Sequence, residues 1–386
     1  MLIGGGVYVE VCITPARTAL YGSGGRAAMV VAGLGAEVVL HAFQPEELLE
    51  DLEANFNPFG ISLVVHPSPQ RLSFEYLHPL ARPRVGPLPA APPITVPIEG
   101  EAVLRFGCLE GDFRVTAASA VYDPQSGVRP EPFNANGSTA SRLAMILNAS
   151  ELRRMTGIDD IGIAASHAMG REAISVLVVK DGAAGAYVFD GHRSPQHVPA
   201  YPTDAVYKIG SGDVFSATFA HAWMCDGIAA ASAAELASLR TAQYVETPVF
   251  PLPREPKSKP TARGDAGGRR VLMVSNDRTA SGRWVRQEAV RGLQDLGATV
   301  VPGMQSPAFS EGPMKETLDP AGFDVILVHI DNVGTARTAL DTAVGCGKPV
   351  VVFADDPEGL VVADKLGVSG SDDLCSALYR TQWIPL

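Results

Sequence analysis

The chain has 386 residues, which is enough for two or three domains that each bury a hydrophobic core. Apolar residues make up 46% and charged residues 19%, with 39 glycines and 30 prolines, so the composition is globular and turn-rich and excludes extensive disorder. The net charge of −11 disfavours nucleic acid as a partner, although local backbone dipoles can still bind a small phosphate ligand.

The five cysteines are dispersed and form no CxxC pair, which indicates reduced thiols without a disulfide framework or zinc site. Residues Met1–Ala16 lack the features of a signal peptide and are predicted to be a first strand. The most apolar stretch, Val214–Ala237, contains too many polar residues to span a membrane. We therefore expect a cytoplasmic protein with no membrane partner.

Composition predicts two domains and a linker. Pro, Gly and charged residues concentrate between Pro251 and Arg270, as in an exposed tether. We place a first domain at residues 1–250, a linker at 251–269 and a second domain at 270–386. A second proline-rich stretch, Pro79–Pro97, is predicted to be a lid or a long surface excursion of the first domain.

Both domains are predicted to be α/β. In the first domain, β-rich runs without strict alternation suggest a parallel sheet covered on both faces, and helices are expected at Arg26–Gly33 and Ala229–Glu246. In the second, four strands alternate with three helical patterns, which predicts a small doubly wound sheet. Its strands are expected at Val271–Ser275, Thr299–Pro302, Asp324–Ile330 and Pro349–Ala354, and its helices at Trp284–Leu296, Thr335–Val344 and Glu358–Leu366.

The most specific motif is KIGSGD at residues 208–213. The apolar positions that follow it have helical spacing, so Asp213 is predicted to lie in the first turn of a helix. Amides at such a glycine-rich helix start can bind a phosphate, and a carboxylate beside it can accept the proton of an attacking hydroxyl. An ordinary capped helix after a glycine turn explains the same string equally well.

Three further segments have both a functional and a structural interpretation. Residues 177–189 predict a strand, a glycine turn and a strand, either beneath a nucleotide or as a plain hairpin. Asn148 and Glu151 stand where a strand runs into a helix, and capping alone explains both. The glycine-rich run at residues 22–25 precedes a helix and either admits ligand hydroxyls or forms a tight connection, and Arg26 can bind an anion bidentately.

In this order, the four segments resemble the ribokinase-like (PfkB) carbohydrate kinase family over residues 1–250. The resemblance implies a layered α/β/α domain with a lid that transfers the γ-phosphoryl group of ATP, with Mg²⁺, to a hydroxyl of a sugar or nucleoside. A homodimer is compatible with it. It implies that Asp213 is the base and that the anion hole is formed by Gly210, Ser211 and Gly212. It implies nucleotide contacts by Lys180, Asp181, Gly182, Gly185 and Lys208, and acceptor contacts by Glu10, Gly24, Gly25 and Arg26. It implies that Asn148 and Glu151 contact the metal through water.

The sequence departs from the family pattern around both pockets. Tyr207 and Lys208 replace an Asp-Thr pair, Arg26 stands where the family has Asn, and Glu10 aligns with the family's first-strand Asp. Ordinary ribose or fructose specificity is therefore not expected. Lys208 either strengthens anion binding or is simply solvated.

Residues 270–386 resemble the nucleoside 2-deoxyribosyltransferase-like fold, of the flavodoxin-like doubly wound type. Active members carry a glutamate nucleophile shortly after a Gly-Thr pair, but here Thr338 and Ala339 occupy those positions and Asp341 is the nearest acid. We therefore expect this domain to bind a nucleotide-like ligand or to mediate assembly.

Two functional hypotheses follow. The leading one is an ATP- and magnesium-dependent sugar or nucleoside kinase. The alternative is a degenerate nucleotide- or sugar-binding protein in which both domains form a ligand-gated assembly module. A third interpretation, glycosyl transfer by the second domain, requires Asp331 or Asp341 as nucleophile.

Overall fold

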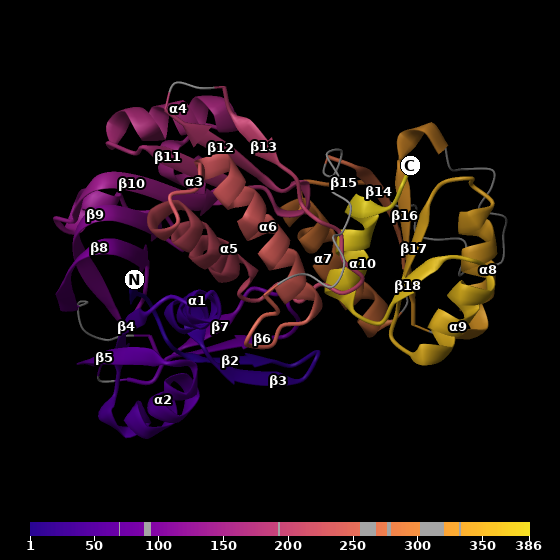
Figure 1. Ribbon diagram of the computed structural model, residues 1–386. Coiled ribbons are helices and arrows are strands. Elements are labelled where there is room, and N and C mark those ends of the chain that lie inside the picture. Colours follow the sequence, from indigo (N-terminus) through magenta and orange to yellow (C-terminus); the bar gives the residue numbers. More distant parts are fainter. Residues whose placement is uncertain are drawn as a thin grey trace. The chain divides into compact units, whose positions relative to one another are not determined.

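The computed structural model describes residues 1–68, 70–88, 94–191, 194–254, 268–275, 279–301, 320–331 and 333–386. The chain divides into two compact units (Figure 1). The first comprises Met1–Leu77, Arg82–Tyr201 and Lys208–Thr261, and the second comprises His78–Ala81, Pro202–Tyr207 and Ala262–Leu386. Of the predicted linker at 251–269, only residues 251–254 and 268–269 belong to the described part of the chain.

A nine-stranded sheet forms the centre of the first unit, as the α/β prediction requires. Its strands are parallel except at one edge, where β12 is antiparallel to both of its neighbours. In spatial order they are β13 (Gln196–Val198), β12 (Ala186–Asp190), β11 (Val176–Lys180), β10 (Thr139–Asn148), β9 (Gly111–Asp123), β8 (Ile94–Phe106), β1 (Leu2–Gly4), β4 (Val38–Gln44) and β5 (Ile61–Pro67).

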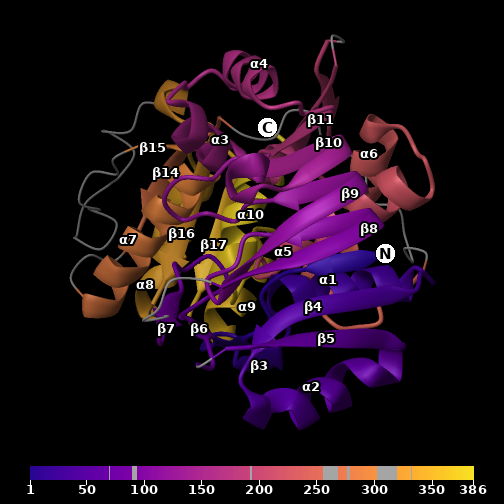
Figure 2. The ribbon, with the colours of Figure 1, turned by 90° about the vertical axis from the view of Figure 1, so that its left-hand side faces the viewer.

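Helices cover this sheet because its strands are apolar on both faces. Leu143, Met145 and Leu147 of β10 pack with the alanines of α4 in one core cluster, and α5 and α6 lie together elsewhere against the sheet (Figure 1). The helix α2 packs on the edge strand β5 (Figure 2). Among the described residues, no helix is both long and apolar enough to cross a bilayer. The helices of this unit are α1 (Gly22–Gly33), α2 (Leu49–Phe56), α3 (Ala149–Thr156), α4 (Ile161–Arg171), α5 (Ser211–Ala220) and α6 (Ala230–Glu246).

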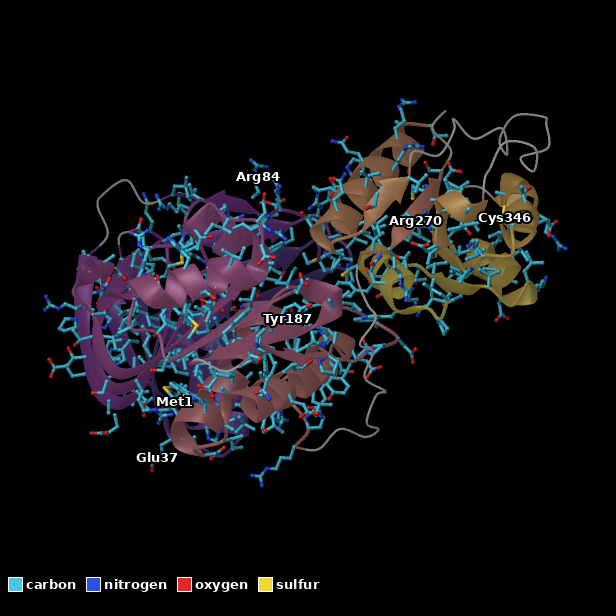
Figure 3. The ribbon with its side chains drawn as sticks, turned by 90° about the horizontal axis from the view of Figure 1, so that it is seen from above. Met1, Glu37, Arg84, Tyr187, Arg270 and Cys346 are labelled. Atoms are coloured by element: carbon cyan, nitrogen blue, oxygen red, sulfur yellow. The ribbon has the colours of Figure 1, made fainter. Side chains whose placement is uncertain are left out.

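The amino terminus forms two strands, so the prediction of one strand over Met1–Ala16 is wrong. Gly4 ends β1, Gly5 and Gly6 follow it, and the chain then enters β2 (Val9–Cys12) in a different sheet. A Cβ at Gly4 would lie 2.9 Å from side-chain atoms of Ile98 and Phe113, so β1 packs where only glycine fits. The terminal amine of Met1 donates to the Glu37 carbonyl oxygen at 2.7 Å (Figure 3).

A four-stranded sheet contains β2 and the first part of the proline-rich stretch. Its order is β3 (Arg17–Leu20), β2, β6 (Ser73–Tyr76) and β7 (Arg84–Gly86). Residues His78–Ala81 of that stretch cluster with the second unit, and residues 89–93 lie outside the described part of the chain. The lid function of Pro79–Pro97 therefore stays a prediction.

The first helix begins at Gly22, earlier than the predicted start at Arg26. Gly22 has a φ of +61°, and a Cβ there would lie 2.5 Å from the Gly6 carbonyl oxygen. This left-handed residue lets the chain enter the helix directly, so Gly24 and Gly25 lie within its first turns.

The second unit contains a parallel five-stranded sheet in the order β15, β14, β16, β17, β18. Counted along the chain, this order is 2-1-3-4-5, one of the common orders of doubly wound sheets. Helices α8 and α9 lie on one side of the sheet and α7 and α10 on the other (Figure 1). The elements are β14 (Arg270–Val274), α7 (Ala280–Asp295), β15 (Thr299–Val301), β16 (Val325–Ile330), α8 (Val333–Val344), β17 (Val350–Ala354), α9 (Pro357–Lys365), β18 (Ser369–Ser371) and α10 (Leu374–Trp383).

Element boundaries in this unit follow capping residues. The helix α7 begins at Ala280, before the predicted Trp284, because the Thr279 side chain accepts from the Gly282 amide as N-cap. Arg270, at the start of β14, forms an ion pair with Asp324 at 2.7 Å. The predicted end of the second strand, Pro302, lies outside the described residues.

Two short segments of the expected first domain pack in the second unit. His78 contacts Glu288 at 3.0 Å, and the amide of Val206 donates to the Ser376 hydroxyl at 2.8 Å. No local pattern in the sequence indicates these contacts, because each joins residues more than 160 positions apart.

The packing of α1 predicts opposite effects for two alanine substitutions in the same helix. A Cβ at Gly24 would lie 2.8 Å from the Gly5 carbonyl oxygen, so Gly24→Ala should lower the free energy of unfolding by about 1–3 kcal/mol. A Cβ at Gly33 meets nothing within 4 Å, so Gly33→Ala should raise it by roughly 0.5–1 kcal/mol. Urea unfolding measures both, and equal effects of the two substitutions would contradict the described packing.

Candidate active site

Asp213 lies in the first turn of α5, as predicted. Gly210, with a φ of +80°, is the N-cap, and the apolar stripe that includes Phe215, Phe219 and Trp223 is buried. The Asp213 residue is only 7% exposed. Its carboxylate is therefore enclosed by protein, and the identity of its neighbours decides what it can do.

Arg26 provides one of those neighbours. This α1 side chain, in a residue 1% exposed, donates through Nη1 to Asp213 Oδ2 at 2.6 Å and through Nη2 to Glu10 Oε2. Its Nε donates to the Tyr244 hydroxyl at 3.0 Å, and that hydroxyl donates to the Ile209 carbonyl oxygen at 2.9 Å. The fold thus brings three predicted residues, Glu10, Arg26 and Asp213, into one buried cluster.

Burial and charge act in opposite directions in this cluster. Burial raises the pKa of Asp213 above its ordinary value, against the lowering effect of the Arg26 guanidinium. Burial likewise raises the pKa of Glu10, and Arg26 again opposes the shift. Burial acts to lower the pKa of Arg26, but the Glu10 carboxylate and its neighbours raise it above the ordinary value. Arg26 is therefore a permanent cation here.

Two residues at the end of β9 complete the surroundings of Asp213, and the sequence analysis missed both. Gln125 donates through Nε2 to Asp213 Oδ1 at 2.6 Å. Asp123 accepts from Lys180 Nζ at 2.8 Å and from the Ser216 hydroxyl at 2.6 Å, both on Oδ2. Asp123 stands at the carboxyl end of β9, a parallel strand between β10 and β8, and this position could have signalled it.

The glycine hairpin is confirmed, and Lys180 stands at its start. β11 and β12 pair antiparallel around the turn Gly182–Ala184. The Asp181 amide donates to the Gly185 carbonyl oxygen at 2.8 Å. Gly185 has a φ of +103°, and a Cβ there would lie 2.1 Å from the Val198 carbonyl oxygen, so packing alone requires this glycine.

Lys180 is a half-buried cation beside the start of α5. Burial acts to lower the pKa of Lys180, and the carboxylates of Asp123 and Glu151 raise it above its ordinary value. Its Nζ lies 3.4 Å from where a Cβ of Gly212 would be. Lys180 thus lies next to the predicted anion loop, and its ion pair with Asp123 fixes its position.

The loop at residues 208–212 is closed on itself. The Ser211 amide donates to the Lys208 carbonyl oxygen at 3.1 Å, and Lys208 Nζ contacts the Ser211 hydroxyl at 2.7 Å. A Cβ at Gly210 would lie 2.0 Å from Arg26 Nε. The Ser211 amide is therefore already used, and an anion here would depend on the following amides of the first turn.

Asn148 and Glu151 form a reciprocal capping box at the start of α3. The Glu151 amide donates to Asn148 Oδ1, and the Asn148 amide donates to Glu151 Oε2, both at 2.8 Å. Burial, with the nearby Asp123 carboxylate, raises the pKa of Glu151 to about 7. Within the described ranges, no three His, Cys, Asp or Glu side chains group as a metal site. The role of the pair at a metal stays a prediction.

Packing explains Gly24 and Gly25. Besides the close approach of Gly24 to Gly5, its amide donates to the Gly6 carbonyl oxygen at 2.9 Å. A Cβ at Gly25 would lie 2.7 Å from the Phe56 ring. These glycines allow α1 to approach β1 closely, and this approach sets the position of Arg26 one residue later.

Glu110 is a further buried acid that the sequence did not indicate. It lies between β8 and β9 and is 8% exposed; its Oε2 accepts from the Leu109 amide at 3.0 Å, and its Oε1 has no hydrogen-bond partner. Burial raises the pKa of Glu110 to about 7. Burial raises the pKa of Tyr8 above its ordinary value. The nearby carboxylates of Glu10, Asp213 and Glu110 raise it further.

The second unit has no carboxylate at the positions expected for a nucleophile. Ala339 is fully buried, and the side chain of Thr338 lies outside the described part. Asp341 is exposed and pairs with Arg337 at 3.0 Å. Asp331 Oδ2 accepts from the Thr279 hydroxyl at 2.9 Å, at the start of α7.

Comparisons with known proteins identify the kind of fold. Residues 141–246 match the model of the pfkB family carbohydrate kinases. No curated protein matches the chain. A fructokinase from Vibrio cholerae O395, solved with fructose, ADP and calcium, has a TM-score of 0.50 at 14% identity, over 64% of this chain and 93% of that protein.

Two other solved structures are similar at slightly lower scores. One is a pyrophosphate-dependent kinase in the ribokinase family, with a TM-score of 0.49 at 19% identity over 64% of this chain and 95% of that one. The other is an aminoimidazole riboside kinase from Salmonella enterica. Its TM-score is 0.48 at 15% identity, over 64% of this chain and 94% of that one. The family match and the fructokinase likeness support a ribokinase-like α/β fold for the first unit.

The raised pKa of Glu110 predicts a pH dependence of stability. Between pH 4.5 and about 7 the folded protein retains a proton that the unfolded chain releases, so the free energy of unfolding falls as pH rises through this window. Glu110→Gln should remove about 3 kcal/mol of that fall. Urea unfolding at pH 5 and pH 8 measures it, with the exposed Glu53→Gln as control. An unchanged fall in Glu110→Gln would refute the assignment.

Proposed function

We propose that the protein is a kinase that transfers a phosphoryl group from ATP, with Mg²⁺, to a hydroxyl of a sugar or nucleoside. The observation that supports this most directly is the position of Asp213. Its carboxylate lies at the amino terminus of α5, beside a glycine turn and in an ion pair with the buried Arg26 guanidinium. The pfkB family match at residues 141–246 includes this helix and is consistent with the proposal.

Asp213 would act as the general base. Arg26 donates to Oδ2 and Gln125 to Oδ1, and each carboxylate oxygen keeps the capacity to accept a second hydrogen bond from an acceptor hydroxyl. The hydroxyl proton passes to the carboxylate as the oxygen attacks phosphorus. The fixed Arg26 guanidinium orients the carboxylate and favours its ionised form, which can accept a proton.

The phosphates of the donor would be bound at the start of α5. Gly212, the helix dipole and the cations Lys180 and Lys208 provide a positive environment for them. When bound, Mg²⁺ would neutralise phosphate charge. The capping box occupies one oxygen each of Asn148 and Glu151, which fits contact through water better than direct ligation.

The acceptor would meet Glu10 and Arg26 as one unit. Because their side chains form an ion pair, neither is an independent ligand for a sugar hydroxyl. This arrangement supports the expectation that ordinary ribose or fructose is not the acceptor. Gly24 and Gly25 contribute by placing Arg26.

Asp213→Asn tests the proposal with the full chain. Sugars and nucleosides are screened for ADP release with ATP and Mg²⁺. With a responding acceptor, we expect the variant to lose at least about a hundredfold in turnover, because the amide cannot accept the proton. Asp226→Asn, which changes an exposed carboxylate beyond the same helix, should retain full activity.

Undiminished turnover in Asp213→Asn would contradict the proposed base. Circular dichroism and the thermal midpoint establish that the variant is folded.

The burial of Asp213 also favours a second candidate, a binding protein without catalysis. In such a protein both carboxylate oxygens would stay occupied by Arg26 and Gln125, and the two units would form a ligand-gated assembly module. Nucleotide binding by calorimetry without turnover of any acceptor supports this candidate. ADP release that depends on an acceptor excludes it.

For the second unit we propose ligand binding rather than glycosyl transfer. The proposal is supported by its doubly wound strand order, since sheets of this type bind ligands at the carboxyl ends of their strands. The nucleoside 2-deoxyribosyltransferase-like resemblance suggests a nucleotide-like ligand. Ala339 supplies no nucleophile, and Asp341 is exposed on α8.

A further inference from the structure

The loop after β9 contains a strained residue in contact with Asp213. Gln125 has a φ of +45°, and it is the only non-glycine residue of the described ranges with a positive φ. A residue with a β-methylene group rarely adopts this left-handed conformation. Such strain persists only where the surrounding structure holds it, and it is concentrated at functional sites.

Contacts on both sides of Gln125 hold the strained conformation. Two residues earlier, Asp123 is fixed by Lys180 and Ser216, and its carbonyl oxygen accepts from the Gly107 amide at 2.9 Å. One residue later, the Ser126 carbonyl oxygen accepts from the Arg154 guanidinium at 3.0 Å.

The strain serves a single side-chain contact. Gln125 Nε2 donates to Asp213 Oδ1 at 2.6 Å while Arg26 holds Oδ2. Two donors on the two oxygens fix the plane of the carboxylate, which a single donor leaves free to rotate. A carboxylate fixed in this way presents its remaining lone pairs in constant directions.

We propose that Gln125 is a positioning residue for Asp213: its strained backbone directs the amide to Oδ1 and so orients the carboxylate toward the acceptor hydroxyl. This inference rests on the proposed kinase function, which it deepens. Gln125 itself is not required to touch the substrate.

A positioning role has a consequence for protonation. The hydrogen bond from Gln125 favours the ionised carboxylate, so its loss should raise the pKa of Asp213 further. The other charged and titratable groups that interact electrostatically with Asp213 lie on separate elements, and a Gln125 substitution does not change them. They are Arg26 on α1, Glu10 on β2, Asp123 at the end of β9, Lys180 on β11, Tyr244 on α6 and Tyr8 before β2.

Two variants separate the hydrogen bond from the strain. Gln125→Met keeps the length of the side chain and removes the donor, and Gln125→Gly removes the donor and relaxes the left-handed backbone. Val128→Ala, at an exposed position of the same loop, is the matched control.

The expected result is a shift in the pH profile of kcat/KM. In both Gln125 variants the acidic limb should move to higher pH, and kcat/KM below it should fall by roughly tenfold to a hundredfold. Gln125→Gly should unfold at a higher temperature than Gln125→Met, because only the glycine relaxes the backbone. The control should match the wild type in both measurements.

A second readout does not depend on turnover. The carboxyl carbon of Asp213 in the ¹³C-aspartate-labelled full chain, assigned by its absence in Asp213→Asn, reports the pKa directly. A raised pKa in both Gln125 variants supports the inference even if no acceptor is phosphorylated, an outcome that would refute only the kinase function. An unchanged pKa and an unmoved acidic limb in an active enzyme would overturn the inference and leave the kinase function standing.

Discussion

The buried guanidinium of Arg26 is the interaction on which the candidate site depends. It connects α1 to Glu10 of β2, to Asp213 of α5 and to Tyr244 of α6, and almost none of it reaches solvent. A cation without water is tolerated only where its partners replace the lost hydration. Each partner is also buried, so removal of any one would take a hydrogen bond from a guanidinium that water barely reaches. This mutual requirement holds three helices and a strand in fixed relation.

The same cluster joins two positions, Glu10 and Arg26, at which the sequence differs from the pattern of the family that it resembles. A glutamate at residue 10 and an arginine at residue 26 are longer than the aspartate and asparagine of the family, and here they meet each other. Arg26 also fills the space beside Gly210, where a side chain would collide with it. This buried cluster contains two carboxylates and one permanent cation, a charge arrangement that differs from a set of neutral amides and hydroxyls. For the proposed kinase, acceptor selectivity is expected to follow from this difference.

A second layer of charge lies behind the first. Asp123 and Lys180 form a pair between β9 and β11, and Ser216 connects it to α5. Gln125 then extends from the same loop to Asp213. The position of the Asp213 carboxylate therefore depends on the loop after β9, which the sheet holds in place. Gln125 contributes to the geometry of Asp213 although it is distant in sequence from the glycine motif. Glycines at residues 24, 25 and 185 contribute differently, because the backbone approaches them too closely for a side chain.

The sequence alone determined the features that arise from local patterns. The helix that begins beside Gly210 with Asp213 in its first turn, the hairpin around Gly182, the capping box of Asn148 and Glu151 and the alternating strands and helices of the second unit all follow from spacing within some fifteen residues. Only the tertiary structure decided which side chains meet. Arg26 and Asp213 are 187 positions apart, Gln125 and Asp213 are 88 apart, and Val206 and Ser376 are 170 apart. Such pairs depend on how strands order in a sheet and how closely helices pack on it, and neither is encoded in a local run of residues.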